Sequence, residues 1–305
     1  MKSILLLEQM LVLLAMMLTG FLAYRMKWLD RQSSNKITTL IVKVLNPMLI
    51  ISSVMGDRPA NSGDALGQDL LLAACYFAFV IAAGYLYRGI RRYDRKEGNR
   101  YILMTAFSNL GFMGIPLVRA VYGPEYVIYI VIYLLIFNIL AYTYGIWLAM
   151  GMSGKTQSFS PILMVNSGFV ICVIAVICFL AHVRLPGPVT TFCNYMGNAA
   201  IPLSMIVIGV SMAQADFKEL FFDKDAYIYL IYRMLIVPAA GILLFRLLPF
   251  RTDVYQIFTL MISMPIATIA GMLAQEFGGQ GTDTNKIILL STIVSVVTIP
   301  LMSLI

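Results

Sequence analysis

Long apolar stretches alternate with short polar ones along the whole chain. A helix that crosses a bilayer needs about 20 mostly apolar residues, and ten windows of the chain meet this requirement. Strands of a membrane β-barrel would alternate apolar and polar residues, and stretches such as "AVICFLA" do not. The pattern therefore predicts an all-α polytopic membrane protein with ten transmembrane helices. The windows are residues 4–24, 36–56, 69–89, 101–121, 126–149, 162–181, 189–211, 226–248, 254–275 and 286–305.

The composition agrees with this class. Of the 305 residues, 60% are hydrophobic and only 12% are charged, and the mean hydropathy is +0.85. A soluble domain carries about one quarter charged residues, and the short polar linkers leave no room for one. Glu8 interrupts the first window, and the positive cluster follows this window instead of preceding it. We therefore expect a retained helix here and not a cleaved signal peptide.

The positive charges predict how the helices are oriented. When the linkers are assigned alternately to two sides, fourteen of the 22 Lys and Arg residues fall on one side and six on the other. The positive-inside rule places the richer side in the cytoplasm. We therefore expect a multi-pass protein of the cell membrane with both termini outside the cytoplasm. Its net charge of +7 then indicates anchoring to the lipid bilayer and not a nucleic-acid partner.

The windows divide into two sets of five. The first set, residues 1–150, would end in the cytoplasm, where "GMSGKTQSFSP" predicts a cytoplasmic linker at residues 151–161. The second set, residues 162–305, would begin inside and end outside. Two five-helix repeats of inverted orientation are an arrangement in which transporters place their substrate site near the bilayer midplane.

Prolines recur at corresponding positions of these two halves. Pro47 and Pro202 lie in the second and seventh windows, each four residues after a polar residue. Pro116 and Pro265 lie near the middle of the fourth and ninth windows. Because a proline removes a backbone donor and clashes with the carbonyl group one turn earlier, we expect four paired interruptions of the transmembrane helices.

The segment "SNLGFMGIPL" (108–117) concentrates helix-disfavouring residues in an apolar window: Asn109, Gly111, Gly114 and Pro116. Non-helical backbone at membrane depth persists only where protein or a watery cavity covers it. Glycine permits unusual dihedrals, asparagine offers a donor and an acceptor, and freed backbone amides at the start of a half-helix favour an anion. The segment indicates a substrate site, and a proline kink that serves packing is the alternative.

At these residues the chain resembles the auxin efflux carrier family, whose members include plant PIN carriers and bacterial malonate-type carriers. The resemblance extends over essentially all ten windows. The chain differs from the plant carriers because it lacks their long hydrophilic central loop, and its ninth window has no Asn matching Asn109. The motifs that carry it are "NPMLI" (46–50), "SNLGFMGIPLVRAVYG" (108–123), "IPLSMIVIGVSMA" (201–213), "MPIATIAGMLAQEFG" (264–278) and "STIVSVVTIPL" (291–301).

This resemblance implies a fold akin to that of the bile-acid symporters. The broken helices four and nine would cross at their unwound centres, helices one, two, six and seven would form a scaffold, and the other six would move in an elevator-type alternating access. The resemblance also implies a homodimer formed through the scaffold, and small organic anions as substrates. Carboxylates similar to malonate, malate or auxin are the expected class.

The candidate substrate-binding residues are polar or helix-breaking residues within the second, fourth, fifth and ninth windows. Asn138 and Tyr142 sit one turn apart and would face the crossing together, and a bond between helices is the alternative for either of them. The full set is Asn46, Asn109, Gly111, Gly114, Pro116, Asn138, Tyr142, Ser263, Pro265 and Thr268.

Lys43 and Arg233 are expected to be buried cations, since both lie within predicted spans. Ionisable residues in spans are candidates for function, here for gating or anion guidance, although each side chain is long enough to extend to the surface instead. The membrane potential alone favours export of an anion by about 2.3 kcal/mol per charge per 100 mV. Efflux is therefore the expected direction, and uptake would need a coupling ion, H⁺ or Na⁺.

A secondary transporter of small organic anions is thus the leading interpretation. A passive anion channel and a non-transporting membrane receptor with a carrier fold are the alternatives. An enzyme is not expected, because the single His, the lack of an HExxH motif and the lack of paired aspartates in the spans leave no catalytic set. The four cysteines lie within spans and show no metal-binding spacing, so we expect no cofactor and no metal.

Overall fold

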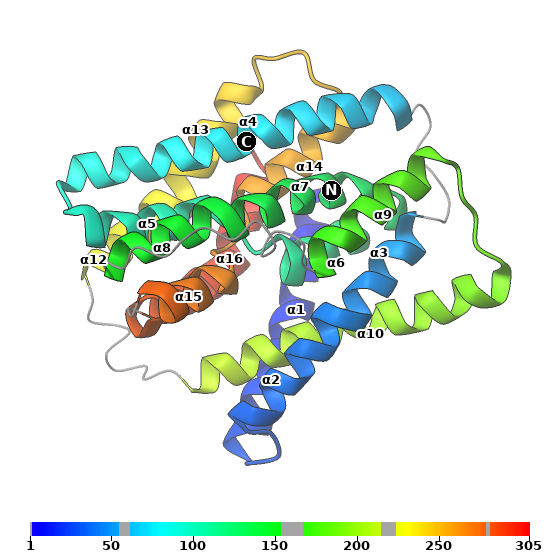
Figure 1. Ribbon diagram of the computed structural model, residues 1–305, viewed down its shortest axis with the longest axis horizontal. Helices are drawn as coiled ribbons and strands as arrows, with labels where there is room; N and C mark the ends of the chain where they lie inside the picture. The colour runs from blue at the N-terminus through cyan, green and yellow to red at the C-terminus, as the bar shows by residue number, and fades with distance from the viewer. Residues whose placement is uncertain (1, 55–61, 154–166, 215–223, 279–280) are drawn as a thin grey trace.

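The structure is a computed structural model that describes residues 2–54, 62–153, 167–214, 224–278 and 281–305 (Figure 1). Within these ranges the regular elements are helices, and one isolated β-bridge is the exception. The predicted linker at 151–161 lies largely outside the described residues. The first-half helices are α1 (Lys2–Arg25), α2 (Arg31–Leu40), η1 (Ile41–Leu45), α3 (Asn46–Val54), α4 (Ser62–Arg91), α5 (Arg95–Ala106), η2 (Leu110–Gly114), α6 (Ile115–Val121), η3 (Pro124–Tyr126), α7 (Val127–Leu140), η4 (Ala141–Gly145) and α8 (Ile146–Ser153).

The second half of the chain continues the same helical architecture. Its helices are α9 (Ser167–Leu180), α10 (Gly187–Ala213), α12 (Lys224–Ile231), η6 (Tyr232–Ile236), α13 (Val237–Phe245), α14 (Thr252–Ile262), α15 (Thr268–Leu273), η7 (Ala274–Gly278) and α16 (Gly281–Met302).

Seven continuous helical segments of the described chain are long and apolar enough to cross a membrane. They agree with seven of the predicted windows. Of the other three, 101–121 and 254–275 are interrupted, and 162–181 is described only from residue 167. The segments are Ile4–Arg25, Arg31–Ser53, Ala65–Arg91, Pro124–Ser153, Gly187–Ala213, Lys224–Phe245 and Thr284–Met302.

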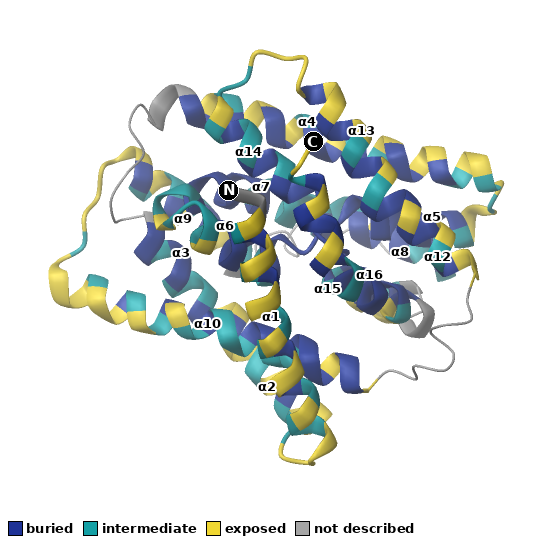
Figure 2. Cartoon of the chain, turned by 180° about the vertical axis from the view of Figure 1, so that it is seen from behind, coloured by how far each residue is buried: buried dark blue, intermediate teal, exposed yellow. Residues whose placement is uncertain are grey.

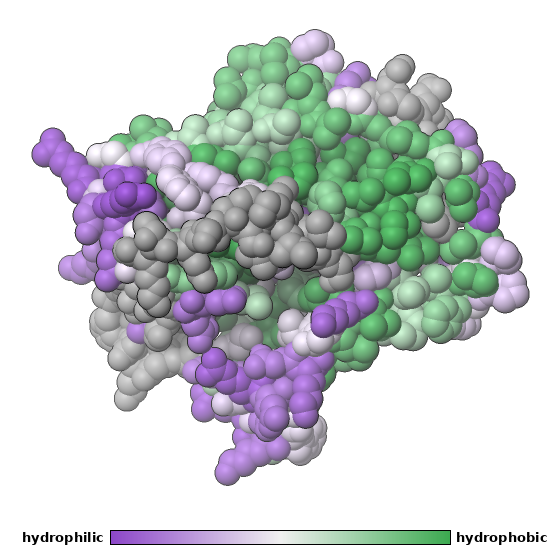
Figure 3. Space-filling view, viewed as in Figure 1, coloured by the Kyte–Doolittle hydropathy of each residue, from purple (hydrophilic) through white to green (hydrophobic). Residues whose placement is uncertain are grey.

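The outer surface of the helices is apolar, as a membrane protein requires. Large apolar side chains on several helices are exposed, among them Leu11, Leu71, Leu86 and Phe192. Figure 2 shows these exposed faces around a buried interior formed by helices such as α5, α7 and α14. In Figure 3 hydrophilic side chains gather at the α4–α5 and α1–α2 turns, beside a broad hydrophobic surface. Extended apolar surface of this kind marks contact with lipid or with another protein, and here it supports a multi-pass membrane protein.

Three of the π-helical turns precede a proline by the same spacing. The turns η1, η2 and η6 each end two residues before Pro47, Pro116 and Pro238, respectively. A proline ring clashes with the carbonyl group four residues earlier, and the wider π turn accommodates it without ending the helix. At Pro47 the predicted interruption is therefore a π turn within a continuous span.

The interruption predicted at Pro202 is wrong. α10 runs unbroken from Gly187 to Ala213 with Pro202 inside it. A proline costs an α-helix one hydrogen bond, and the residues around Pro202 contain strong helix formers such as Ala200 and Met205 instead of the Asn–Gly–Gly set that precedes Pro116. Packing of α10 along α1 and α3 holds this helix in one piece.

Glycines allow α1 and α10 to cross at very close range. A Cβ atom on Gly20 would overlap the backbone of Ile206, and one on Gly209 would overlap the backbone of Met17. Small residues at helix crossings are a general feature of membrane proteins, because lipid provides no hydrophobic driving force and close contact must supply the attraction. These helices, with α2 and α3, form one packed group (Figure 1).

Candidate functional site

Two helices are interrupted in the middle of the molecule, and the two interruptions lie against each other. Residues 107–109 separate α5 from η2, and residues 263–267 separate α14 from α15. The segments run antiparallel and meet in a bridge between Ser108 and Ile266. The N–H group of Ile266 donates a hydrogen bond to Ser291 Oγ on α16 (3.1 Å). A third helix therefore helps to satisfy the non-helical backbone.

The two interruptions also satisfy each other's backbone groups. The N–H of Asn109 donates to the carbonyl oxygen of Pro265 (2.7 Å), and the N–H of Ala267 donates to that of Phe107 (2.9 Å). Unpaired backbone groups at membrane depth cost several kcal/mol each. The pairing explains how extended residues persist in the interior of an otherwise helical protein.

The η2 turn after the first interruption leaves unfilled space. Asn109 is buried, and its side chain caps η2 by accepting a hydrogen bond from the N–H of Phe112 (3.2 Å). A Cβ atom added to Gly111 would meet nothing within 4 Å, whereas one on Gly114 would touch Met261 on α14. Open space beside a capped and interrupted helix is where a small solute can approach the backbone.

A buried cation reaches the same interruption from η6. Arg233 is fully buried, and its Nη2 donates a hydrogen bond to Ser108 Oγ (2.5 Å). The Ser108 hydroxyl is also within 2.6 Å of the Tyr76 hydroxyl on α4. Arg233 comes from η6, Tyr76 from α4 and Ser108 from the first interruption, and the three side chains form one polar cluster around the bridge residue Ser108.

The guanidinium group of Arg233 is only partly satisfied. Its Nε and Nη1 atoms are buried and have no hydrogen-bond partner among the described residues, and it forms no ion pair there. Burial of a charge is costly unless a counter-charge and hydrogen bonds compensate it. The arrangement can therefore bind an anion that supplies both the charge and the missing acceptors.

Comparison with known proteins assigns the class of protein that carries this site. A family model described as "Membrane transport protein", the auxin efflux carrier family, matches residues 5–168 and 163–303. The chain belongs to this family. It is also 25% identical, over 98% of its own length and 97% of the relative's, to a protein of Methanothermobacter thermautotrophicus (strain Delta H) named an uncharacterized transporter. The protein is thus a membrane transporter, and the predicted family is confirmed.

The fifth predicted helix of the transporter lies beside both interruptions. α7 contacts η2, and η4 contacts α15. Asn138 on α7 is half-buried, and its Nδ2 donates to the carbonyl oxygen of Leu134 one turn earlier (2.7 Å). Tyr142 is half-buried in η4. Asn138 is therefore engaged within its own helix in this conformation, and its Oδ1 and second Nδ2 hydrogen are left for a solute or another helix.

The predicted residues of the ninth helix lie within or next to the second interruption. Ser263 is buried and donates to the carbonyl oxygen of Thr259 (2.7 Å). Pro265 is buried and pairs with Asn109 through its carbonyl group. Thr268 is half-buried at the first position of α15. Of these three predicted residues, Pro265 is the one that hydrogen-bonds to the first interruption, through its backbone carbonyl group.

The two predicted residues of the second helix lie apart from this cluster. Asn46 is half-buried at the start of α3, and it forms no side-chain hydrogen bond with the described residues of the paired interruptions. Lys43 is exposed in η1, so the expectation that it is buried is wrong. Its side chain lies on the outside of the helix bundle, and it is long enough for the amine to extend toward water.

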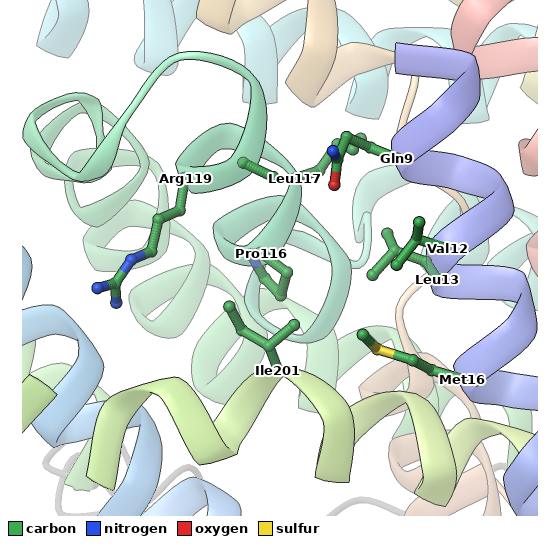
Figure 4. A pocket seen from close by; sticks show the side chains of 9 residues that line it. Gln9, Val12, Leu13, Met16, Pro116, Leu117, Arg119 and Ile201 are labelled. Atoms are coloured by element: carbon green, nitrogen blue, oxygen red, sulfur yellow. The ribbon is translucent and has the colours of Figure 1, made fainter. Parts of the chain in front are cut away.

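A groove of about 210 Å³ lies on the other side of α6 (Figure 4). Pro116 and Ile201 lie at its centre, and Arg119 extends from α6 at its edge. Its other lining residues come from α1 and α6: Gln9, Val12, Leu13, Met16, Leu117 and Ala120. The groove lies between α6, α1 and α10, and α6 also contacts α1 directly.

Sequence reasoning missed Ser108 and Tyr76. Ser108 precedes Asn109 in the same motif. A hydroxyl group beside a predicted interruption could have indicated a candidate binding residue. Tyr76 carried no signal, because a tyrosine in an apolar window is typical of packing. Its role is visible only from the hydrogen bond with Ser108.

Proposed function

We propose that this transporter is a secondary carrier of small organic anions and that the anion binds at the paired interruptions with Arg233 as its counter-charge. One observation carries the proposal: a fully buried arginine donates to Ser108 in the first interruption, and two of its nitrogen atoms have no partner among the residues that the structure describes. Carboxylates of the malonate, malate or auxin type have the charge and the acceptor oxygens that these donors lack.

The energetics of Arg233 favour this assignment over a purely structural role. A structural buried arginine is normally fully hydrogen-bonded, because each unmade bond to a charged group costs 1–3 kcal/mol or more. Here the guanidinium has one acceptor, Ser108, and no described carboxylate. A carboxylate that accepts from Nε and Nη1 would satisfy the group in the bidentate geometry that suits arginine.

The proposed architecture is ten transmembrane helices in two inverted five-helix repeats whose broken helices four and nine cross. The antiparallel pairing of residues 107–109 with 263–267 supports it, since repeats related by an axis in the membrane plane bring their corresponding helices together in opposite directions. The broken helix four would be the α5–α6 segment, and the broken helix nine would be the α14–α15 segment.

An elevator-type motion fits the packing. The scaffold would contain α1, α2–α3, α9 and α10, where glycine contacts join α1 to α10, and it would also form the homodimer. The remaining helices, with both interruptions and Arg233, would move as one body. We place the protein in the cell membrane with both termini outside and infer efflux, because the membrane potential drives anions outward.

Counterflow in proteoliposomes tests the proposal. Labelled malonate, malate and indole-3-acetate would be assayed against an excess of the same unlabelled acid inside, with protein-free vesicles subtracted. We expect counterflow of at least one acid. Arg233→Gln should reduce it about 10- to 150-fold, since a hydrogen bond to a charged group is worth about 1.5–3 kcal/mol. Asn109→Ala should reduce it as well.

The control variant is Arg246→Gln. Arg246 is an exposed arginine at the end of α13 that donates to the carbonyl oxygen of Ile305, and its loss should leave counterflow unchanged. Full activity of Arg233→Gln would disprove the site assignment. A passive channel would show flux without acceleration by the unlabelled acid, and a receptor would bind acids without flux.

A further inference from the structure

A second unpartnered charge lies on the helix that carries Tyr76. Asp69 on α4 is fully buried, and both of its carboxylate oxygens lack a hydrogen-bond partner among the described residues. Asp69 lies within the apolar span Ala65–Arg91. An isolated carboxylate in such a place is among the most costly groups in a membrane protein, whereas the protonated acid needs no counter-ion.

Among the described residues, the groups around Asp69 offer it no free cation. Tyr133 on α7 is fully buried, and its hydroxyl has no hydrogen-bond partner in the described part of the chain. Asp69 interacts electrostatically with it and with Asp253 at the start of α14. Arg251 is engaged with Asp253, and α13, which also packs on α4, carries no titratable side chain. Among the side chains that the structure describes, the titratable or charged groups near this end of α4 are Tyr129 and Tyr133 of α7, Arg251 and Asp253 at the α14 start, and Cys75 and Tyr76 of α4.

These groups form a continuous series from Asp69 to the proposed anion site. Asp69 and Tyr76 are seven residues apart on α4 and so share one face, about 10 Å apart along the axis. The Tyr133 ring lies 5.6 Å from the Tyr76 ring, and Tyr76 reaches Ser108, which accepts from Arg233. The buried acid and the buried cation, neither of which has a described counter-charge, are thus separated by the neighbouring rings of Tyr133 and Tyr76 and by the hydrogen bonds that join Tyr76 and Arg233 to Ser108.

We propose that Asp69 is a proton-binding site coupled to the anion site through Tyr133, Tyr76 and Ser108, so that a proton and an organic anion are carried together. This inference rests on the proposed function. The step is a simple protonation: the Asp69 carboxylate takes one proton from water on one side of the membrane and releases it on the other. Each such proton cancels one negative charge of the anion that moves with it, so the coupled anion responds to the pH gradient, and the outward direction inferred above applies to the anion that moves without a proton.

A proton fits the site better than a metal ion does. Cations such as Mg²⁺ or Ca²⁺ require six or more oxygen ligands, and the described residues contain no group of three or more His, Cys, Asp or Glu that could hold a metal. A proton needs one oxygen atom. The unpartnered hydroxyl of Tyr133 can then donate to the other oxygen or accept from the protonated acid.

Infrared spectroscopy of the purified protein tests the proton site without any substrate. At neutral pH we expect the carbonyl stretch of a protonated carboxylic acid, lost in Asp69→Asn and retained in the control Asp225→Asn. Asp225 is an exposed acid that pairs with Arg91 at the far end of α4. The same band in all three proteins would overturn the proposal. If Asp69→Asn does not fold, Tyr133→Phe must shift the band, and an unshifted band would contradict the site.

Transport driven by a pH gradient tests the coupling. For labelled malonate or malate, an interior one pH unit more alkaline should give the wild type about tenfold accumulation per coupled proton. Asp69→Asn should keep counterflow and lose this accumulation, whereas Asp225→Asn should behave as wild type. A wild type that exchanges the anion without responding to the gradient, or an Asp69→Asn variant that still accumulates it, would overturn the coupling. Absence of counterflow in the wild type would instead contradict the proposed function, and the infrared result would then decide the proton site alone.

Discussion

The backbone N–H of Asn109 donates a hydrogen bond of 2.7 Å to the carbonyl oxygen of Pro265. This bond joins two helices from opposite halves of the chain at the point where both are unwound. Each interruption would leave buried backbone groups unpaired if it stood alone. The two halves therefore depend on each other at the site, which gives the first prediction.

Ala267→Pro should weaken this pairing selectively. Ala267 has φ −73° and ψ 141°, which a proline can adopt, and the substitution removes the N–H that donates to Phe107. The carbonyl group of Phe107 is then left buried without a donor, and we expect a loss of about 1–3 kcal/mol of stability. Thermal unfolding in detergent measures it. Ala267→Ser keeps the N–H and is the control, and equal melting temperatures for the two variants would contradict the prediction.

The interruptions could be predicted from sequence only in part. Asn, Gly and Pro in one apolar window disfavour a helix locally, so the neighbourhoods of Pro116 and Pro265 were visible. The non-helical residues 107–109 lie well before Pro116, because the η2 turn accommodates the proline and the pairing partner determines which residues leave the helix. Pro202 shows the converse: helix formers and packing on α1 keep α10 continuous.

The polar groups of the site illustrate a further limit of sequence reasoning. Arg233 could be singled out because a cation within a span is rare. Its contact with Ser108 could not be predicted from the sequence, because that contact depends on how two segments far apart in the sequence pack. Asp69 was overlooked because it stands at the edge of an apolar window, where a charged residue is usually solvated, whereas packing against α7 and α14 buries it.

The space next to Gly111 gives a matched pair of substitutions. Gly111→Ala meets no atom within 4 Å, whereas Gly145→Ala would press on Leu273 and Phe107 at 3.0–3.2 Å. Alanine should therefore leave stability unchanged or raise it by up to about 1 kcal/mol at Gly111 and lower it by about 1–3 kcal/mol at Gly145. If the anion occupies the space at Gly111, counterflow should fall in that stable variant. Undiminished counterflow there would place the anion elsewhere.

The α1–α10 crossing should be intolerant of side chains. Gly209→Leu places a side chain where the backbone of Met17 already lies, and overpacking of this kind costs about 1–3 kcal/mol or more. Gly89→Ala is the control, since that position in α4 is exposed and has open space around it. Thermal unfolding should separate the two variants clearly. A Gly209→Leu protein as stable as wild type would show that α1 and α10 can separate without cost.

Asp253 should make stability sensitive to acid. Burial raises the pKa of this carboxyl group, but hydrogen bonds from Arg251, the Val254 N–H and Tyr129, with the charge of Arg251, outweigh it and hold the pKa below its usual value. A carboxyl group whose pKa is lowered by folding stabilises the folded state, and this stabilisation is complete at pH values above the unfolded-state pKa of about 3.9. It is lost as the pH falls through the lower pKa of the folded state. Asp253→Asn should thus cost about 0.2–1 kcal/mol at neutral pH. The difference in melting temperature from wild type should shrink below about pH 4, and a constant difference would contradict the assignment.

Arg233→Met separates a binding role from a structural one. A methionine removes the buried charge and fills a similar volume, and replacing buried ionic groups by apolar ones is often neutral or stabilising by about 1–4 kcal/mol. Since Arg233 has no described acidic partner that would be stranded, the ligand-free variant should melt at or above the wild-type temperature. The acids that stabilise the wild type against heat should no longer do so in the variant, because their counter-charge is gone. A large drop in the melting temperature of the ligand-free variant would mean that Arg233 holds the helices together, and the buried charge would then need another explanation than an anion.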